Sequence, residues 1–370
     1  MAGARDHWIR DVMSGSATGF GPTLLRGLLT VVEPGYRLGT AIRNKLFDRS
    51  ILPARKLPKP VVSVGNLTTG GTGKTPTVTW LARRLQHDLG LHVAVLLRGY
   101  KRSSDAGSDE EILLRDALPG TTVLAHPNRY ETASHALARG TPINAFVLDD
   151  GFQHRKLDRD FDLVLLDATN PFGYGHVLPR GMLREAPTAL RRADAVLITR
   201  ADLADPGELE EIEQTARRGA GRSIPVFRWH HQPGPVTIAG ESPQPIGWLR
   251  DRRVFVIAGI GNPGAFERSL SSAGAEVVGR RFFADHHDYA QADVEAVLDA
   301  ASSVLAELIV TTHKDRVKLQ QIVGVESQVA DIGMKLAYVD VSIAFEADHE
   351  ARLFELIANA IQLPNAQRQQ

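Results

Sequence analysis

A glycine-rich turn between an apolar run and a helical pattern constrains the fold of this chain most strongly. Residues 65–75 read Gly-Asn-Leu-Thr-Thr-Gly-Gly-Thr-Gly-Lys-Thr. Pro60–Gly65 before the turn has the composition of a short buried strand, and Lys74–Leu89 has the spacing of a helix. A strand that passes through such a turn into a helix is typical of a P-loop, whose glycines let the backbone approach a phosphate chain closely.

The turn predicts a binding site for a nucleoside triphosphate with magnesium. Its amides and the helix N-terminus would present positive partial charge to phosphates. Lys74 would reach the β- and γ-phosphates, and the hydroxyl of Thr75 would ligate Mg²⁺. The first glycine of the usual pattern falls at Thr68, so this is a variant loop, and the alternative is a glycine-rich turn without a ligand. The residues expected to bind are Thr68, Thr69, Gly70, Gly71, Thr72, Gly73, Lys74 and Thr75.

Strand and helix patterns alternate through most of the chain. After the turn, short apolar runs recur with helical patterns between several of them, at His92–Leu97, Ile143–Asp149, Asp162–Asp167, Ala195–Thr199, Val254–Ala258, Ala275–Gly279, Leu308–Thr312 and Tyr338–Val341. This alternation predicts an α/β protein with a P-loop NTPase-like, mostly parallel sheet flanked by helices. We expect a second, smaller α/β domain, joined to the first by a β-rich linker.

The length of 370 residues favours two domains, because a single core seldom organises so long a chain. We expect an N-terminal helical, basic segment at 1–59 and a P-loop core at 60–227. A linker at 228–252 contains four prolines among glycines and short β-like pieces. The smaller domain follows at 253–364, ends in a helix near 347–361, and leaves a disordered tail at 365–370.

Composition excludes several kinds of site and partner. Lys and Arg number 43, as do Asp and Glu, so the neutral chain gives no electrostatic reason to expect nucleic acid. Cysteine is absent, which rules out disulfides, thiolate zinc sites and cysteine nucleophiles and fits a reducing compartment. We expect neither a secretory signal nor a membrane-spanning helix, and no obligate protein partner is evident.

The N-terminal segment combines an apolar pattern with a basic cluster. Leucines and valines between Leu24 and Val32 recur at near-helical spacing, and seven basic residues follow between Arg37 and Lys59. This combination suits a helix that lies on an anionic membrane surface. The alternative is a helix packed on the core with its basic face in solvent.

A second motif, Asp149-Asp150-Gly151-Phe152-Gln153-His154, follows the apolar run Ile143–Leu148. A carboxylate at a strand end beside a P-loop is where a magnesium ligand belongs, so Asp149 and Asp150 are candidate metal residues. Gln153 and His154 are placed to face the same cleft. The alternative is a polar turn after a buried strand.

Three weaker motifs remain open. Phe283–Tyr289 holds two histidines between two aspartates, which could tune each other's protonation, ligate a metal or lie in a solvated loop. Gly259–Gly264 matches the dinucleotide fingerprint, although Pro263 also fits ordinary helix initiation. Thr199–Asp202 resembles the guanine-reading tetrad of GTPases with Arg in place of Lys, and a strand end with a turn is the favoured interpretation.

Taken in order, these motifs resemble the tetraacyldisaccharide 4'-kinase family over nearly the whole chain. The resemblance rests on Ser63–Asn66 running into Gly70–Pro76, and on Arg98–Tyr100, Asp109-Glu110, Asp149–His154, Leu178-Pro179, Leu183–Glu185, Gly259–Pro263, Asp285–His287, Lys314-Asp315 and Lys318-Leu319. Several motifs in one order are far more specific than any single motif.

The resemblance implies transfer of the γ-phosphate of ATP to the 4'-hydroxyl of a lipid A disaccharide 1-phosphate, giving lipid IVA. It implies a peripheral enzyme on the cytosolic side of the bacterial inner membrane. Asp109 would accept the proton of the sugar hydroxyl, with His286 positioning and polarising it, and Mg²⁺ would be supported by Asp149 or Asp150. The residues assigned to the substrate side are Arg98, Gln153, His154, Arg184 and Glu185.

Two rival functions use subsets of the same motifs. A P-loop ATPase or GTPase switch of the partitioning or metal-chaperone type would use Lys74 and Asp149 without a sugar acceptor. Such switches often carry an additional lysine early in the loop, where this chain has Thr68 and Thr69. A dinucleotide-binding oxidoreductase built on Gly259–Gly264 would leave the P-loop unexplained.

Overall fold

The structure is a computed structural model that describes residues 2–99, 109–238, 241–261, 263–284, 287–322 and 324–362. The chain divides into two compact units. The first comprises residues 1–230 and 343–370, and the second comprises residues 231–342.

The first unit is built on a parallel sheet in the order β3-β2-β4-β1-β5-β6-β7. The strands are β1 (Val61–Asn66), β2 (Val93–Leu97), β3 (Thr122–Ala125), β4 (Ala145–Asp149), β5 (Phe161–Asp167), β6 (Ala195–Thr199) and β7 (Val226–Ile238). β1 lies between β4 and β5, with Val64 opposite Asp149 in the register. Because parallel strands end at one edge, Asn66, Asp149 and Asp167 are brought to the same edge of the sheet.

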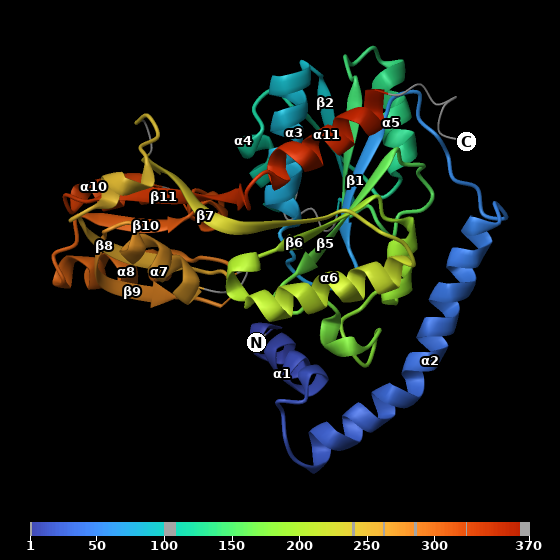
Figure 1. Ribbon diagram of the computed structural model, residues 1–370. Coiled ribbons are helices and arrows are strands. Elements are labelled where there is room, and N and C mark those ends of the chain that lie inside the picture. The colour runs from blue at the N-terminus through green and yellow to red at the C-terminus, as the bar shows by residue number, and fades with distance from the viewer. Residues whose placement is uncertain are drawn as a thin grey trace. The chain divides into compact units, whose positions relative to one another are not determined.

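Helices cover both faces of this sheet (Figure 1). One face packs against α3 (Lys74–Leu89), α4 (Asp109–Ala117) and α11 (His349–Gln362), and the other against α5 (Arg129–Ala138) and α6 (Pro206–Ala220). Alternate residues of β5 enter opposite cores: Leu163 and Leu165 join the first, while Val164 and Leu166 join the second. The strands are therefore apolar throughout, as strands covered on both faces must be.

Two helices precede the sheet, α1 (Ala2–Ser14) and the long α2 (Phe20–Asp48), which contains Pro34 (Figure 1). Short 3₁₀ turns follow the strands at η1 (Gly173–Gly175), η2 (Pro187–Arg192) and η3 (Ala201–Leu203). Among the described residues, none of the helices has the length and apolar character that a membrane crossing requires.

The second unit contains its own parallel sheet in the order β11-β10-β8-β9. Its strands are β8 (Arg253–Ala258), β9 (Glu276–Phe282), β10 (Leu308–Thr312) and β11 (Lys335–Phe345). Its helices are α7 (Pro263–Ser272), α8 (Gln291–Ser303), α9 (His313–Leu319) and α10 (Val325–Asp331), with a 3₁₀ turn η4 at Ile246–Leu249. Separate cores form on the two faces of this sheet, around α7 and around α8.

The predicted fold class, a mostly parallel sheet flanked by helices with a second α/β unit, is confirmed. Two details of the predicted division are wrong. The terminal helix α11 belongs to the first unit, because Leu353 and Ile357 are buried in the core beneath α3. The segment expected to be a linker from residue 228 begins inside β7, which continues to Ile238 despite Pro233 and Pro235. The expected disordered tail lies outside the described residues.

Candidate functional site

The glycine-rich turn leaves β1 at Asn66 and enters α3 at Lys74, as the sequence predicts. Two glycines are required by close approach. A Cβ at Gly65 would lie 2.6 Å from the backbone N of Phe152, so the turn after β4 packs directly on the end of β1. Gly73 has a φ of 80° and faces the buried ring of Trp229, 2.6 Å from where a Cβ would lie.

A neighbouring segment braces the turn from one side. The N–H of Thr69 donates to the carbonyl of Met182 (2.8 Å), and the N–H of Arg184 donates to the carbonyl of Leu67 (2.7 Å). Thr68 and Leu183 form an antiparallel bridge between these two bonds. The main chain of 182–184 therefore runs along the first half of the turn.

A second brace comes from Arg200, directly after β6. One guanidinium nitrogen donates to the carbonyl of Gly71 (2.9 Å), and another pairs with the carboxylate of Asp167 at the end of β5. Arg200 sits in the left-handed region with a φ of 54°, at the start of a 3₁₀ turn. Thr199–Asp202 is thus the end of a strand followed by a 3₁₀ turn, which is the interpretation that the sequence favours. Through Arg200 it also holds the glycine-rich turn in place.

The ammonium group of Lys74 rests among three weak partners. Its Nζ lies 3.4 Å from Oδ1 of Asn66, 3.5 Å from the carbonyl of Gly70 and 3.7 Å from Oδ1 of Asp150. All three distances exceed the usual ~2.9 Å of a good N–H···O bond. The ammonium group therefore has only weak partners beside the turn. Phosphate oxygens could replace these partners with little loss of interaction energy.

Asp150 lies between two cations. NH1 of Arg184 donates to both of its carboxylate oxygens at 2.8 and 2.9 Å, and Nζ of Lys74 lies 3.7 Å from its Oδ1. Burial acts to raise the pKa of Asp150, but the charges of Lys74 and Arg184 outweigh it and hold the pKa below its usual value. Asp150 is therefore ionised at neutral pH.

The side chain of Gln153 ties this group to the end of β1. Its Nε2 donates to the carbonyl of Asn66 (2.9 Å), and its Oε1 accepts from Arg184 (3.3 Å). Five residues that the sequence proposes for nucleotide, metal or substrate are thus brought to one edge of the sheet: Lys74, Asp149, Asp150, Gln153 and Arg184.

Asp149 is buried at the end of β4, and its carbonyl accepts from NH2 of Arg129 (2.8 Å). NH1 of Arg129 donates to the carbonyl of Asp150 (3.3 Å). Burial lowers the pKa of Arg129, with the nearby aspartates opposing that effect. Arg129 is a site residue that sequence reasoning missed, because an arginine within a short helical pattern gives no signal that it is buried.

His154 is held in its neutral form. Burial lowers its pKa to about 4, and the positive charges of Arg129, Arg159, Lys156 and Arg43 act in the same direction. At neutral pH this imidazole can therefore offer a hydrogen bond but no charge.

The described residues fit a magnesium nucleotide. Thr72 Oγ1 is buried in the turn without a hydrogen-bond partner, and Lys74 stands ready at the N-terminal end of α3. No group of three or more His, Cys, Asp or Glu side chains able to hold a metal occurs in the part of the chain that the structure describes. A nucleotide-bound Mg²⁺ does not need such a cluster, because it is usually held by one or two protein ligands, with phosphate oxygens and water completing its shell.

The other predicted residues are placed less directly. Arg98 is exposed after β2, and its charge acts on Arg129. Glu185 is only 2% exposed and contacts Asn44 and Arg192. Asp109 is the first residue of α4, and the description does not extend to its side chain. His286 lies outside the described residues.

The glycine-rich motif Gly259–Gly264 of the second unit begins at a residue that packs against side chains of that unit. The N–H of Gly259 donates to the carboxylate of Asp315 (3.0 Å), and a Cβ at Gly259 would lie 3.0 Å from both Asp315 and the Tyr289 hydroxyl. The first glycine of this motif is thus bonded to and packed against side chains of its own unit. In the neighbouring histidine motif, His287 pairs with Asp293 (2.9 Å) and stacks on Phe283.

Comparison with known proteins gives one consistent answer. The profile of the family described as tetraacyldisaccharide-1-P 4'-kinase matches residues 25–362. The chain is 43% identical to the tetraacyldisaccharide 4'-kinase of Anaeromyxobacter dehalogenans over 307 residues, which are 79% of this chain and 80% of that protein. It is 40% identical to the protein of the same name from another Anaeromyxobacter species over 352 residues, covering 90% and 91%.

A solved structure is similar over almost the same length. The "apo" form of LpxK from Aquifex aeolicus, crystallised in complex with ATP, superimposes with a TM-score of 0.69 at 29% identity. The similarity covers 91% of this chain and 99% of that one.

Proposed function

The chain belongs to the tetraacyldisaccharide-1-P 4'-kinase family, and from that premise we propose how its residues carry out the reaction. It is an ATP-dependent kinase of lipid A biosynthesis, which transfers the γ-phosphate of ATP to the 4'-hydroxyl of a tetraacyldisaccharide 1-phosphate. One observation carries the assignment of the site: Lys74 and Arg184 converge on Asp150 at the carboxyl edge of the sheet, beside a P-loop.

The turn from Thr68 to Thr75 binds the triphosphate in this proposal. Amides of the turn and the N-terminus of α3 face the phosphates, and Lys74 moves from Asp150 to the β- and γ-phosphate oxygens. Thr75 and one of Asp149 and Asp150 hold Mg²⁺, which when bound neutralises phosphate charge. Phosphoryl transfer needs mostly such positioning and charge neutralisation, because the protein has little covalent chemistry to perform.

Arg184, Gln153, His154 and Arg98 face the sugar phosphate headgroup of the lipid. The contacts of Arg184 support this role. Its guanidinium already binds a carboxylate, and it would bind a phosphate in the same manner. His154 supplies a neutral hydrogen-bonding group, as its lowered pKa requires.

Asp109 accepts the proton of the attacking 4'-hydroxyl, and His286 orients and polarises it. The support is family membership and the order of the motifs, since Asp109 opens α4 and Asp285-His286-His287 follows β9. A general base is worth about 10²–10⁴-fold in rate.

Replacement of each member of this pair tests the proposal. Asp109→Asn and His286→Gln should each lower kcat by at least ~100-fold while the affinity for ATP stays within about threefold. Asp116→Asn, a change of the same type in the same helix, serves as the control. If Asp109→Asn and His286→Gln turn over lipid at the normal rate, neither residue takes part.

The chain works on the cytosolic face of the bacterial inner membrane, with α2 lying on the lipid surface. α2 exposes a stripe of large apolar side chains, namely Phe20, Leu24, Leu28, Val31, Val32, Leu38 and Ile42. At about 100° per residue, these positions fall within roughly 120° of the helix circumference. Arg37, Lys45 and Arg49 lie exposed on the same helix or at its end, which suits an anionic surface.

A further inference from the structure

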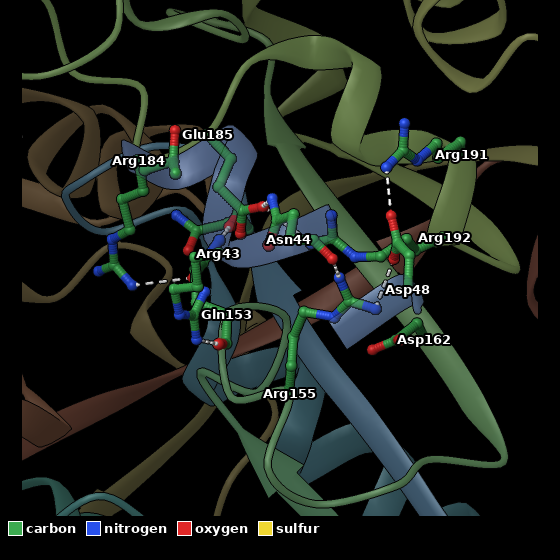
Figure 2. A network of polar contacts seen from close by, with 12 residues as sticks. Arg43, Asn44, Asp48, Gln153, Arg155, Asp162, Arg184, Glu185, Arg191 and Arg192 are labelled. Atoms are coloured by element: carbon green, nitrogen blue, oxygen red, sulfur yellow. Dashed lines mark hydrogen bonds and ion pairs between the residues drawn. The ribbon is translucent and has the colours of Figure 1, made fainter. Parts of the chain in front are cut away.

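The face of α2 that is turned away from the apolar stripe is bound to the catalytic unit by polar contacts. Glu33 accepts from the N–H of Val177 (3.0 Å) and contacts Nδ1 of His176 (2.9 Å). Farther along, the Tyr36 hydroxyl donates to the carbonyl of Arg184 (3.1 Å). Near the end of the helix, Asn44 reaches Glu185 (Figure 2). These contacts lie along residues 176–185, which include the segment 182–184 that braces the P-loop.

The contact between Asn44 and Glu185 is buried. Nδ2 of Asn44 donates to Oε2 of Glu185 at 2.5 Å, and NH2 of Arg192 donates to the same oxygen at 3.0 Å. Asn44 is 8% exposed and Glu185 is 2% exposed. The Arg192 guanidinium stacks on the ring of Phe152, which follows the aspartate turn. Glu185 is therefore fixed between a helix and an arginine, with little surface left for a direct contact with substrate.

Glu185, whose carboxylate is fixed in this way, directly follows Arg184, which contacts both Asp150 and the P-loop turn. The backbone N–H of Arg184 holds Leu67 of the P-loop turn, and its guanidinium holds Asp150. A shift of Glu185 would move the main chain of Arg184 and, with it, the position of the guanidinium. Buried polar networks of this kind fix one geometry when their partners are present.

A second set of contacts secures the same end of α2. NH2 of Arg43 donates to the carbonyl of Gln153 (2.7 Å), and Arg155 donates to the carbonyl of Asn44 (2.8 Å). Asp48 pairs with Arg155 (2.7 Å) and Arg191 (2.5 Å), as Figure 2 shows. The helix is thus bonded to two of the segments that bear proposed headgroup residues, the one with Gln153 and His154 and the one with Arg184.

We propose that α2 is a positioning element of the active site and that Asn44 is its key positioning residue, acting through Glu185 to hold Arg184 in place. Glu185 then belongs to the support of the site and does not touch the lipid. The inference rests on the proposed headgroup role of Arg184.

Removing the amide of Asn44 tests this role. In Asn44→Leu the new side chain has nearly the same size but donates no hydrogen bond. Arg192 is then the remaining donor of the two that bond to Oε2 of Glu185. We expect kcat/KM for the lipid to fall about tenfold, with KM for ATP within about twofold, because Lys74 lies on α3 and Arg200 still holds the second half of the turn through the carbonyl of Gly71. Thr30→Ala is the matched control, since Thr30 is exposed on the same helix and its hydroxyl donates to the carbonyl of Arg26 one turn earlier.

Exchanging donor and acceptor separates positioning from direct contact and from a simple loss of stability. Asn44→Asp alone places two carboxylates together, and Glu185→Gln alone removes the charge, so each should lower lipid turnover. Combined, the two changes restore a hydrogen bond of opposite direction and leave one negative charge beside Arg192. We expect the double variant to recover most of the lipid kcat/KM, with its thermal midpoint close to that of the wild type.

The proposal is overturned if Asn44→Leu keeps the wild-type kcat/KM for lipid, or if the double variant regains its thermal midpoint but not its turnover. The second result would mean that the Glu185 carboxylate itself serves the reaction. Arg184→Ala, measured in parallel, tests the underlying assignment. Normal lipid kinetics in Arg184→Ala would refute the headgroup role, whereas a loss in Arg184→Ala beside normal kinetics in Asn44→Leu would refute only the role of α2.

Discussion

At the scale of residues, the site is an alternating row of charges. The carboxylate of Asp150 contacts both Lys74 and Arg184, so one negative charge is shared by two cations. Asp150 adopts a φ of 49°, and Gly151 after it lies where a Cβ would come within 2.4 Å of Ser63. The turn after β4 is therefore specified by close packing as well as by charge, and Asp150 cannot drift from Lys74 without disturbing β1.

His154 leads to a prediction about pH and stability. Its pKa is about 4 in the folded chain and about 6.5 when unfolded, so the unfolded chain binds more protons between these values. The neutral histidine contributes stability that is present above pH ~6.5 and is lost as the pH falls toward 4. His154→Gln should flatten the pH dependence of the unfolding free energy in this window.

Denaturant unfolding of both proteins from pH 4 to 7.5 checks this prediction. His87→Gln is the control, because His87 lies exposed in the last turn of α3. An equally steep pH dependence in wild type and His154→Gln would show that His154 is not held neutral.

At the scale of elements, the P-loop and the aspartate turn behave as one packed unit. Gly65 has no room for a side chain because Phe152 lies against it. Gly65→Ala should destabilise the chain by about 1–3 kcal/mol, since the neighbour is backbone and must move. Thermal or denaturant unfolding measures this cost.

Gly71→Ala provides a comparison within the same turn, because no heavy atom lies within 4 Å of a Cβ there. Its unfolding free energy should stay within about 0.5 kcal/mol of the wild type. Equal stability of Gly65→Ala and Gly71→Ala would contradict the close packing of the two turns.

The two faces of α2 lead to a separate prediction about membranes. Leu28 and Val31 are 57% and 78% exposed, and burying such side chains fully is worth about 1.5–3 kcal/mol each. Leu28→Ser combined with Val31→Ser should lower partitioning onto anionic phospholipid vesicles by at least about tenfold in a sedimentation assay. Thr30→Ala, on the other side of the helix, should bind as the wild type does. Undiminished binding of the double variant would remove α2 from the lipid surface.

At the scale of the whole molecule, the sequence predicts the family and the fold, and both are confirmed. The reason is local: β1, the turn and α3 are specified by residues 60–89, and predicted Lys74–Leu89 and Ala195–Thr199 coincide with α3 and β6. The roles of Asp109, His286 and the metal residues stay predictions.

Long-range packing explains what the sequence did not reveal. α11 is separated from α3 by more than 250 residues of chain, yet they share a core, so no local pattern could assign it to the first unit. Arg129 and Arg200 brace the site by donating to backbone carbonyls. Every residue has such a carbonyl, so the sequence does not show which one an arginine will contact. β7 continues through Pro233 and Pro235, although prolines are rare inside strands and led us to expect a linker there.

The central claim is that the turn leading into Lys74 holds ATP for transfer to the lipid. The most direct test incubates the chain with radiolabelled ATP, Mg²⁺ and detergent-dispersed tetraacyldisaccharide 1-phosphate, and measures label on the lipid. The wild type and Lys335→Ala, which alters an exposed lysine, should label it equally, whereas Lys74→Ala should be slower by on the order of a hundredfold or more. Labelling by Lys74→Ala at the wild-type rate would contradict the account.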